Sequence, residues 1–142
     1  MDILKSIKTV TVNEEKKQSD SNLRIFGTKI ANIHTDITFA EFTDNHLLLV
    51  SQNGKIGNVL KVSKHQRGGE NFNTAQDVFE VRSLFGVERV EEQAVARFIA
   101  EKLGLQKPLI VLLHLYNYDR ATVLALLDAV KNKLENDMQF AL

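Results

Sequence analysis

The chain contains four histidines, the residue type that most often transfers protons or binds metal ions near neutral pH. Zinc sites place histidine or cysteine ligands in pairs a few residues apart. The histidines of this chain match no such spacing, and there is no cysteine to complete a site. We therefore predict no metal centre, no cofactor and no thiol chemistry. The four histidines are His34, His46, His65 and His114.

The segment Gly54–Gly57 carries Lys55 between glycines, as phosphate-binding loops do. Such a loop, however, has a longer glycine spacing, a Ser or Thr directly after the lysine and a helix that follows. Here Ile56 follows the lysine, and apolar stretches flank the segment, which is typical of a turn between strands. The paired acids Glu91 and Glu92 open a predicted helix, and its dipole explains them without catalysis.

The chain is therefore predicted not to be an enzyme. His114 lies among strand leucines, where a structural histidine is more common than a ligand. The alternative, an enzyme site, would need a pocket that brings His34 or His114 to an acidic side chain. The serines lack the sequence context of a nucleophile elbow. The functional residues are therefore expected to bind a partner and not to react with a substrate.

The composition narrows the class of partner. Lys plus Arg number 18 and Asp plus Glu number 18, so the net charge is zero. Nucleic acids and anionic membranes select a basic surface, which makes both poor candidates. No apolar run approaches the ~20 residues of a membrane span, and we see no signal-peptide core. We expect a cytoplasmic location, with the nucleus left open as a second compartment.

Three parts of the chain differ in composition. The stretch Asn13–Asn22 is polar throughout and cannot offset its ordering entropy by burial, so residues 1–22 are predicted to be a mobile extension. Residues 23–135 are predicted to form a single domain, and residues 136–142 a frayed tail.

Two stretches, Leu47–Val50 and Leu109–Leu113, are apolar on consecutive residues. Successive strand side chains point to opposite faces, so both faces of these strands should leave water. Helices are predicted at 90–103, ending at Gly104, and at 120–134, capped by Asp119. Two helices cover about one face of a small sheet. The other face should therefore require a second protein.

Further strands are expected at 25–33, 35–42 and 77–84. The predicted fold class is α+β. It comprises a mostly antiparallel six-stranded sheet with two helices on one face, the other face being used for dimerisation.

The dipeptide Asn53-Gly54 favours a type I′ turn, because both residues tolerate a positive φ. We therefore predict a hairpin of strands 46–52 and 55–63, with Leu48 opposite Val59. One face of this hairpin would belong to the core and carry Leu47, Leu49, Ile56, Leu60 and Val62. The other face is the predicted partner interface and carries Leu48, Val50, Gln52, Lys55, Val59 and Lys61.

The run HLLLVSQNGKIGNVLKV at 46–62, preceded by the strand TDITFAEF at 35–42, resembles the proteasome assembly chaperone 3 family. In that family a leucine and valine strand, a Q-x-G-K-[MI]-G turn and a late Pro-Leu strand recur in this order. The resemblance covers about residues 28–134. The N-terminal extension and the 64–76 loop depart from the family pattern. The matching motif residues are Gln52, Gly54, Lys55, Ile56, Gly57, Pro108 and Leu109.

The resemblance implies a non-enzymatic chaperone that pairs with a proteasome assembly chaperone 4-like subunit, or with itself when alone. It also implies transient binding to α-type subunits of the 20S proteasome ring, notably α5, with release before the particle matures. A small longin-like or profilin-like adaptor in a trafficking or GTPase-regulatory complex is the alternative. On the chaperone hypothesis, the predicted ring-facing residues are Asn53, Gly54, His65, Arg67, Gly68 and Gly69.

Overall fold

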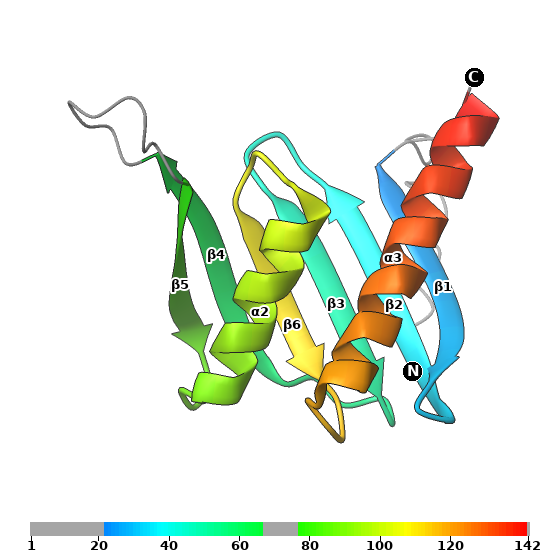
Figure 1. Ribbon diagram of the computed structural model, residues 1–142, viewed down its shortest axis with the longest axis horizontal. Helices are drawn as coiled ribbons and strands as arrows, with labels where there is room; N and C mark the ends of the chain where they lie inside the picture. Colours follow the sequence, from blue (N-terminus) through cyan, green and yellow to red (C-terminus); the bar gives the residue numbers. More distant parts are fainter. Residues whose placement is uncertain (1–21, 67–76, 142) are drawn as a thin grey trace, which may run out of the picture.

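The computed structural model describes residues 22–66 and 77–141. The predicted extension at 1–22 therefore lies almost wholly outside the described residues. So does the predicted 64–76 loop, except for its first three residues. The described elements are β1 (Leu23–Ile30), β2 (Ile33–Glu41), β3 (His46–Gln52), β4 (Asn58–Gln66), β5 (Asp77–Phe85), α2 (Val90–Leu103), β6 (Leu109–His114) and α3 (Arg120–Ala141) (Figure 1).

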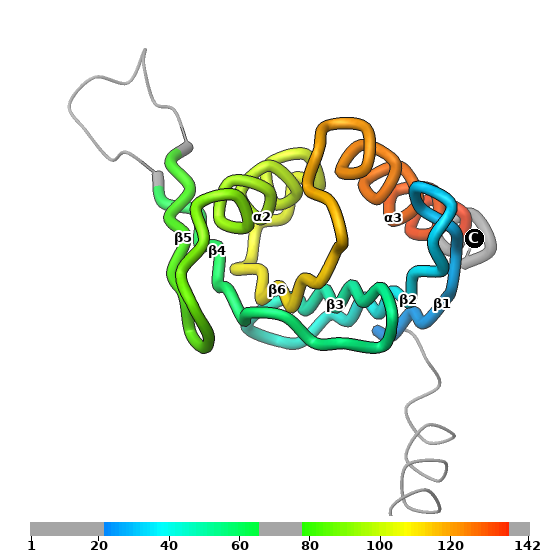
Figure 2. The backbone as a smooth tube through the Cα atoms, turned by 90° about the horizontal axis from the view of Figure 1, so that it is seen from below, coloured from blue at the N-terminus to red at the C-terminus, as the bar shows by residue number. Residues whose placement is uncertain are grey.

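The six strands form one sheet in the order β1-β2-β3-β6-β4-β5. The β3 and β6 strands run parallel, and every other neighbouring pair is antiparallel. Both helices lie on the same face of this sheet (Figures 1 and 2). The predicted α+β class, with a mostly antiparallel six-stranded sheet and two helices on one face, is confirmed.

The predicted hairpin between β3 and β4 is wrong, because β6 lies between these two strands. The turn itself has the expected conformation, with φ of 67° at Asn53 and 68° at Gly54. A Cβ atom at Gly57 would overlap the backbone carbonyl oxygen of Leu113, so the connection passes directly against the end of β6. The chain crosses β6 here and pairs with its far edge. The most apolar strand thereby gains a neighbour on both edges.

The core lies between the sheet and the helices. On the helix side, Phe39, Leu48, Val111 and Leu60 form one continuous row across β2, β3, β6 and β4. All four side chains are buried. The helices cover this face with Val95, Ala96, Ile99 and Ala100 from α2 and Val123, Leu126, Leu127 and Val130 from α3.

Local signals set the helix ends. Gly104 ends α2 in the left-handed conformation, with φ of 65°, and its N–H donates to the carbonyls of Ala100 and Glu101. Asp119 caps α3 by accepting a hydrogen bond from the Thr122 N–H at 2.9 Å. Both caps were predicted from the sequence. The last helix continues to Ala141, beyond its predicted end at Leu134.

Candidate functional site: an uncovered sheet face

The sheet face opposite the helices, called the open face below, carries the residues that alternate with the core residues. In β3 the side chains of Leu48 and Val50 are buried, whereas Leu47 and Leu49 are partly exposed. In β6 the side chains of Ile110 and Leu112 are partly exposed in the same way. Leucine and isoleucine side chains thus meet water at the centre of the sheet.

Two rows of the open face cross all six strands in register. The first row begins with Leu23, Ala40, Leu47 and Ile110 and ends with Lys61 and Arg82. The second row is apolar almost throughout. It comprises Ile25, Thr38, Leu49, Leu112, Val59 and Phe85.

The outer positions of these rows are the most exposed. Ile25 is 65% exposed at one edge of the sheet and Phe85 is 75% exposed at the other. Six strands span about 29 Å and a seven-residue strand about 23 Å, so the open face measures roughly 650 Å². A standard dimer interface buries about 800 Å² per partner. The open face is therefore of the size and character of a protein interface.

The predicted interface residues are corrected in part by the burial of their side chains. Leu48, Val50 and Gln52 are at most 1% exposed beneath the helices, so they cannot meet a partner, and Lys55 lies exposed in the β3–β4 turn. Val59 and Lys61 do lie on the open face. Of the residues predicted for the core, Leu60 and Val62 are buried, Ile56 is exposed in the turn, and Leu47 and Leu49 are on the open face.

The insertion of β6 is the physical cause of this correction. The predicted register placed Leu48 opposite Val59 on one face. In the sheet, Leu48 shares a row with Leu60, and Leu49 shares a row with Val59, because both rows run through β6. A change of register by one residue moves every side chain of a strand to the other face.

One end of the sheet, called the Gln52 end below, is tied together by the buried side chain of Gln52. The Gln52 amide donates to the Ile30 carbonyl at 3.3 Å and to Thr35 Oγ1 at 3.1 Å, and it accepts from the Tyr116 N–H at 2.9 Å. These bonds join the β1–β2 turn, the end of β3 and the β6–α3 loop. The one signal in the sequence is a glutamine at the end of a strand whose centre, Leu47–Val50, is apolar.

Asn58 fixes the neighbouring β5–α2 loop. Its side chain donates to the Val87 carbonyl at 2.7 Å and accepts from the Val87 N–H at 3.0 Å. It also donates to the Glu92 carboxylate at 2.6 Å, and Glu92 in turn accepts from the Tyr118 hydroxyl at 3.3 Å. Burial raises the pKa of Tyr118. No local pattern in the sequence indicates this network, because its members lie far apart along the chain.

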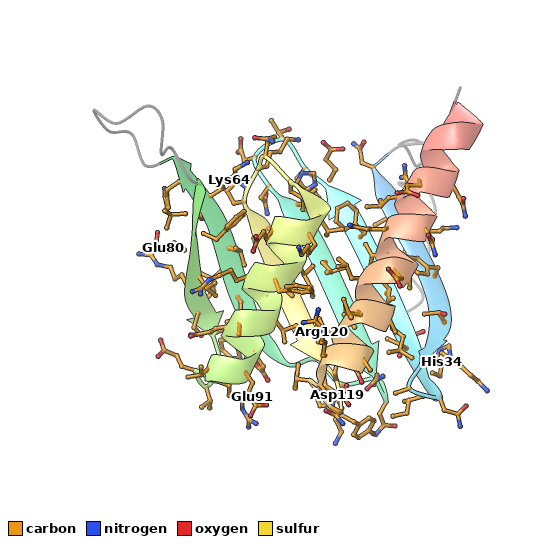
Figure 3. The ribbon with its side chains drawn as sticks, viewed as in Figure 1. His34, Lys64, Glu80, Glu91, Asp119 and Arg120 are labelled. Atoms are coloured by element: carbon orange, nitrogen blue, oxygen red, sulfur yellow. The ribbon has the colours of Figure 1, made fainter. Side chains whose placement is uncertain are left out.

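The loops at the Gln52 end and the first residue of α2 expose large apolar side chains. Both helices begin at this end, where Glu91 and Asp119 lie in Figure 3. The exposed fraction is 82% for Val90, 68% for Val87, 67% for Ile56 and 57% for Tyr116. Monomeric proteins rarely expose large apolar clusters without a function.

The predicted ring-facing residues do not form a single surface. Asn53 and Gly54 are exposed at the Gln52 end. His65 is exposed near the opposite end of β4, where its neighbour Lys64 lies in Figure 3. The strand β4 runs from one end of the sheet to the other, so it separates these groups. The remaining predicted residues, Arg67, Gly68 and Gly69, lie outside the described residues.

The histidines are not gathered into one site. The Nε2 atom of His34 lies 2.9 Å from Oδ1 of Asp36, and that of His65 lies 2.9 Å from Oε2 of Glu80. All four side chains are exposed. His46 is buried and stacks on Phe39 with ring centroids 5.6 Å apart. Among the side chains that the structure describes, we find no cluster of three or more His, Asp or Glu residues that could hold a metal ion. No helix of the described part of the chain is long and apolar enough to span a bilayer.

Asp36, Ser51 and His114 share one row of the open face. A catalytic triad places the histidine between the serine and the acid. Here the serine occupies the middle strand, and the Ser51 hydroxyl donates to the Lys55 carbonyl at 2.6 Å. Asp36 and His114 lie two strands apart, about 10 Å. The three side chains of this row are therefore not arranged as a catalytic triad.

Two titratable residues are register partners at the start of β3: His46, its first residue, and Glu41, the last residue of β2. Burial lowers the pKa of His46, and its Nδ1 atom has no hydrogen-bond partner among the described residues. Glu41 accepts a hydrogen bond from Lys107 at 2.9 Å, which lowers the pKa of Glu41. Lys107 also donates to the Phe42 carbonyl at 3.0 Å. These bonds fasten the segment before β6 to the end of β2.

Comparisons with known proteins agree with the fold and with the resemblance described above. The fold is similar to that of a chain in the crystal structure of a novel chaperone complex for yeast 20S proteasome assembly. The TM-score is 0.66 at 17% sequence identity, over 78% of this chain and 96% of that chain. No curated protein matches the sequence. The sequence profile of the family described as proteasome assembly chaperone 3 matches residues 48–133, which is more than half of the chain. The chain therefore belongs to the proteasome assembly chaperone 3 family.

Proposed function

We propose that this chain pairs through its open face with a related chaperone subunit, similar to proteasome assembly chaperone 4, and transiently holds α-type subunits while the 20S α-ring forms. Family membership supports the broader role of a non-catalytic proteasome assembly chaperone. The same membership is the reason why we favour this role over a trafficking adaptor.

The observation that carries the proposal is the pair of rows on the open face. The second row brings Ile25, Leu49, Leu112, Val59 and Phe85 to one surface that neither helix covers. Burying apolar surface yields about 25 cal/mol per Å², which is enough to hold two subunits together when a face of this size is covered. A lasting chaperone pair is the association that this surface fits.

The contact with an α-type subunit such as α5 must be weaker, because it ends before the particle matures. We place it at the Gln52 end, where three loops present Ile56, Val87 and Tyr116, and the start of α2 presents Val90. These few apolar side chains give a smaller contact than the open face does. Release then leaves the chaperone pair intact.

The test is capture of the affinity-tagged full chain from its own cells, followed by identification of the bound proteins by mass spectrometry. We expect a related chaperone subunit together with proteasome α-type subunits. Val87→Asp combined with Val90→Asp should lose the α-type subunits and keep the chaperone subunit. A soluble monomer at micromolar concentration that binds no chaperone subunit would refute the pairing. Recovery of trafficking proteins in place of proteasome subunits would favour the adaptor.

A further inference from the structure

Two cations lie side by side on the open face. Lys61 of β4 and Arg82 of β5 are direct register partners. Both lie on the face opposite the buried Leu60 and Val62. Lys61 is partly exposed and Arg82 is exposed. Neither side chain forms an ion pair with any side chain that the structure describes.

This arrangement is unfavourable for the isolated chain. Like charges directly opposite each other on neighbouring strands repel. Covering such charges with an apolar partner surface would cost more, because an unpaired charge loses its hydration. The pair also continues the row of Leu23, Leu47 and Ile110, so a partner that covers those side chains approaches the cations as well.

A second copy of this chain is a poor match for the pair. The acidic side chains on the described part of the open face are Asp36 and Glu80. Each already lies 2.9 Å from a histidine nitrogen of its own chain, Asp36 from His34 and Glu80 from His65. On the described part of the open face, a copy would therefore bring two more cations and only carboxylates that already contact a histidine.

We infer that the partner of the open face is a different polypeptide that places one or more carboxylates opposite Lys61 and Arg82, and that these cations select it over a second copy of the chain. The inference rests on the proposed pairing and adds the chemistry that determines its specificity. Complementary charges at an interface suppress wrong partners by several kcal/mol. The apolar rows supply the affinity between the two subunits, and the two cations determine which polypeptide binds.

The first test is zero-length cross-linking of the complex between the full chain and the chaperone subunit identified by the capture experiment. A carbodiimide joins an amine to a carboxylate only when the two are in contact. We expect Lys61 to be linked to an Asp or Glu of the partner, identified by mass spectrometry of the digested complex. A Lys61 that stays unlinked in a complex cross-linked at other lysines would overturn the inference.

The second test reverses the charges. Lys61→Glu combined with Arg82→Glu should weaken binding of the chaperone subunit by roughly 30-fold or more, measured by titration calorimetry. Replacing the cross-linked carboxylate of the partner with lysine should restore it. The matched control is Arg97→Glu with Arg120→Glu, which makes the same change in net charge at exposed positions on the helices. The control should bind as the wild type does.

Equal binding by the Lys61→Glu, Arg82→Glu variant and the wild type would overturn the inference while leaving the pairing intact. So would self-association of the wild-type chain as tight as its binding to the chaperone subunit, measured by sedimentation equilibrium. Failure of the wild-type chain to bind any chaperone subunit would instead refute the proposed pairing itself.

Discussion

Leu48 and Leu49 are consecutive in β3 and lie on opposite faces of the sheet, Leu48 fully buried beneath the helices and Leu49 partly exposed on the open face. Leu48 is the register partner of Val111 in the core, and Leu49 is the register partner of Leu112 on the open face. On the proposed pairing, folding depends on Leu48 and partner binding on Leu49.

Leu48→Asp should impair folding, whereas Leu49→Asp should impair binding of the partner. An aspartate at position 48 places an unpaired charge in the core, so the free energy of unfolding should fall by more than about 4 kcal/mol, enough to unfold many domains of this size. An aspartate at position 49 should leave the stability of the isolated chain within about 1 kcal/mol and abolish binding of the chaperone subunit. Urea denaturation and a binding titration measure the two effects. Reversed results would place the core on the other face.

Asn58→Ala should destabilise the chain by about 2–4 kcal/mol, because it removes three hydrogen bonds and leaves the buried Glu92 carboxylate without its closest donor. Asn58→Asp should cost more, since two carboxylates would then face each other. Asn132→Ala, at an exposed position of α3, is the control and should change stability by less than about 0.5 kcal/mol. Equal stability of the two alanine variants would show that this network contributes little.

Gly57→Ala and Gly54→Ala separate steric contact from backbone conformation. A methyl group at Gly57 would overlap the Leu113 carbonyl, so the connection would have to move away from β6. No atom lies within 4 Å of the corresponding position at Gly54, where the cost comes from the positive φ alone and should be about 1 kcal/mol. Thermal unfolding should therefore show the larger loss for Gly57→Ala. The opposite order would mean that the crossing past β6 can adjust easily.

Stability should fall as the pH drops below 6.5, partly because of His46. Burial holds the pKa of the folded-state imidazole below that value, so the unfolded chain binds the proton first. The contribution of His46 is complete above pH 6.5 and is lost as the pH falls toward the folded-state pKa. The charge of Glu41 raises the pKa of His46, and the charge of Lys107 lowers it further.

His46→Phe keeps an aromatic ring beside Phe39 and removes the titration. Urea denaturation at pH 7.5 and pH 5.5 should show a smaller loss of stability for this variant than for the wild type. Comparison with the wild type removes the contribution of the other histidines. An unchanged difference between the two pH values would exclude His46 as a source of the dependence.

The two helices and their caps at Gly104 and Asp119 could be predicted because their signals are local. The C-cap of α2 depends only on the positive φ of Gly104. The N-cap of α3 depends only on the hydrogen bond from the backbone N–H three residues after Asp119. The strand positions followed from apolar patterning for the same reason. The one strand predicted across 25–33 ends at Ile30, because Ala31 and Asn32 adopt positive φ values in a turn.

The order of the strands could not be predicted in this way, because it depends on pairing between distant segments. Asn53 and Gly54 do form the expected turn, but the turn does not specify which strand the returning chain meets. The pairing of β6 with β3 determines which face of the sheet each leucine occupies. The expectation of an apolar face that the helices leave uncovered did not depend on this order, because it rested on how many apolar positions two helices could cover. Of the six residues assigned to that face, Val59 and Lys61 lie on it.

The central position of β6 has a consequence for synthesis of the protein. The two strands that flank β6 leave the ribosome well before it does, so each carries an unpaired inner edge while α2 is still being translated. Unpaired edges of apolar strands readily join other chains. A nascent chain truncated before residue 109 should therefore aggregate, and the finished sheet can close only when its last strand inserts.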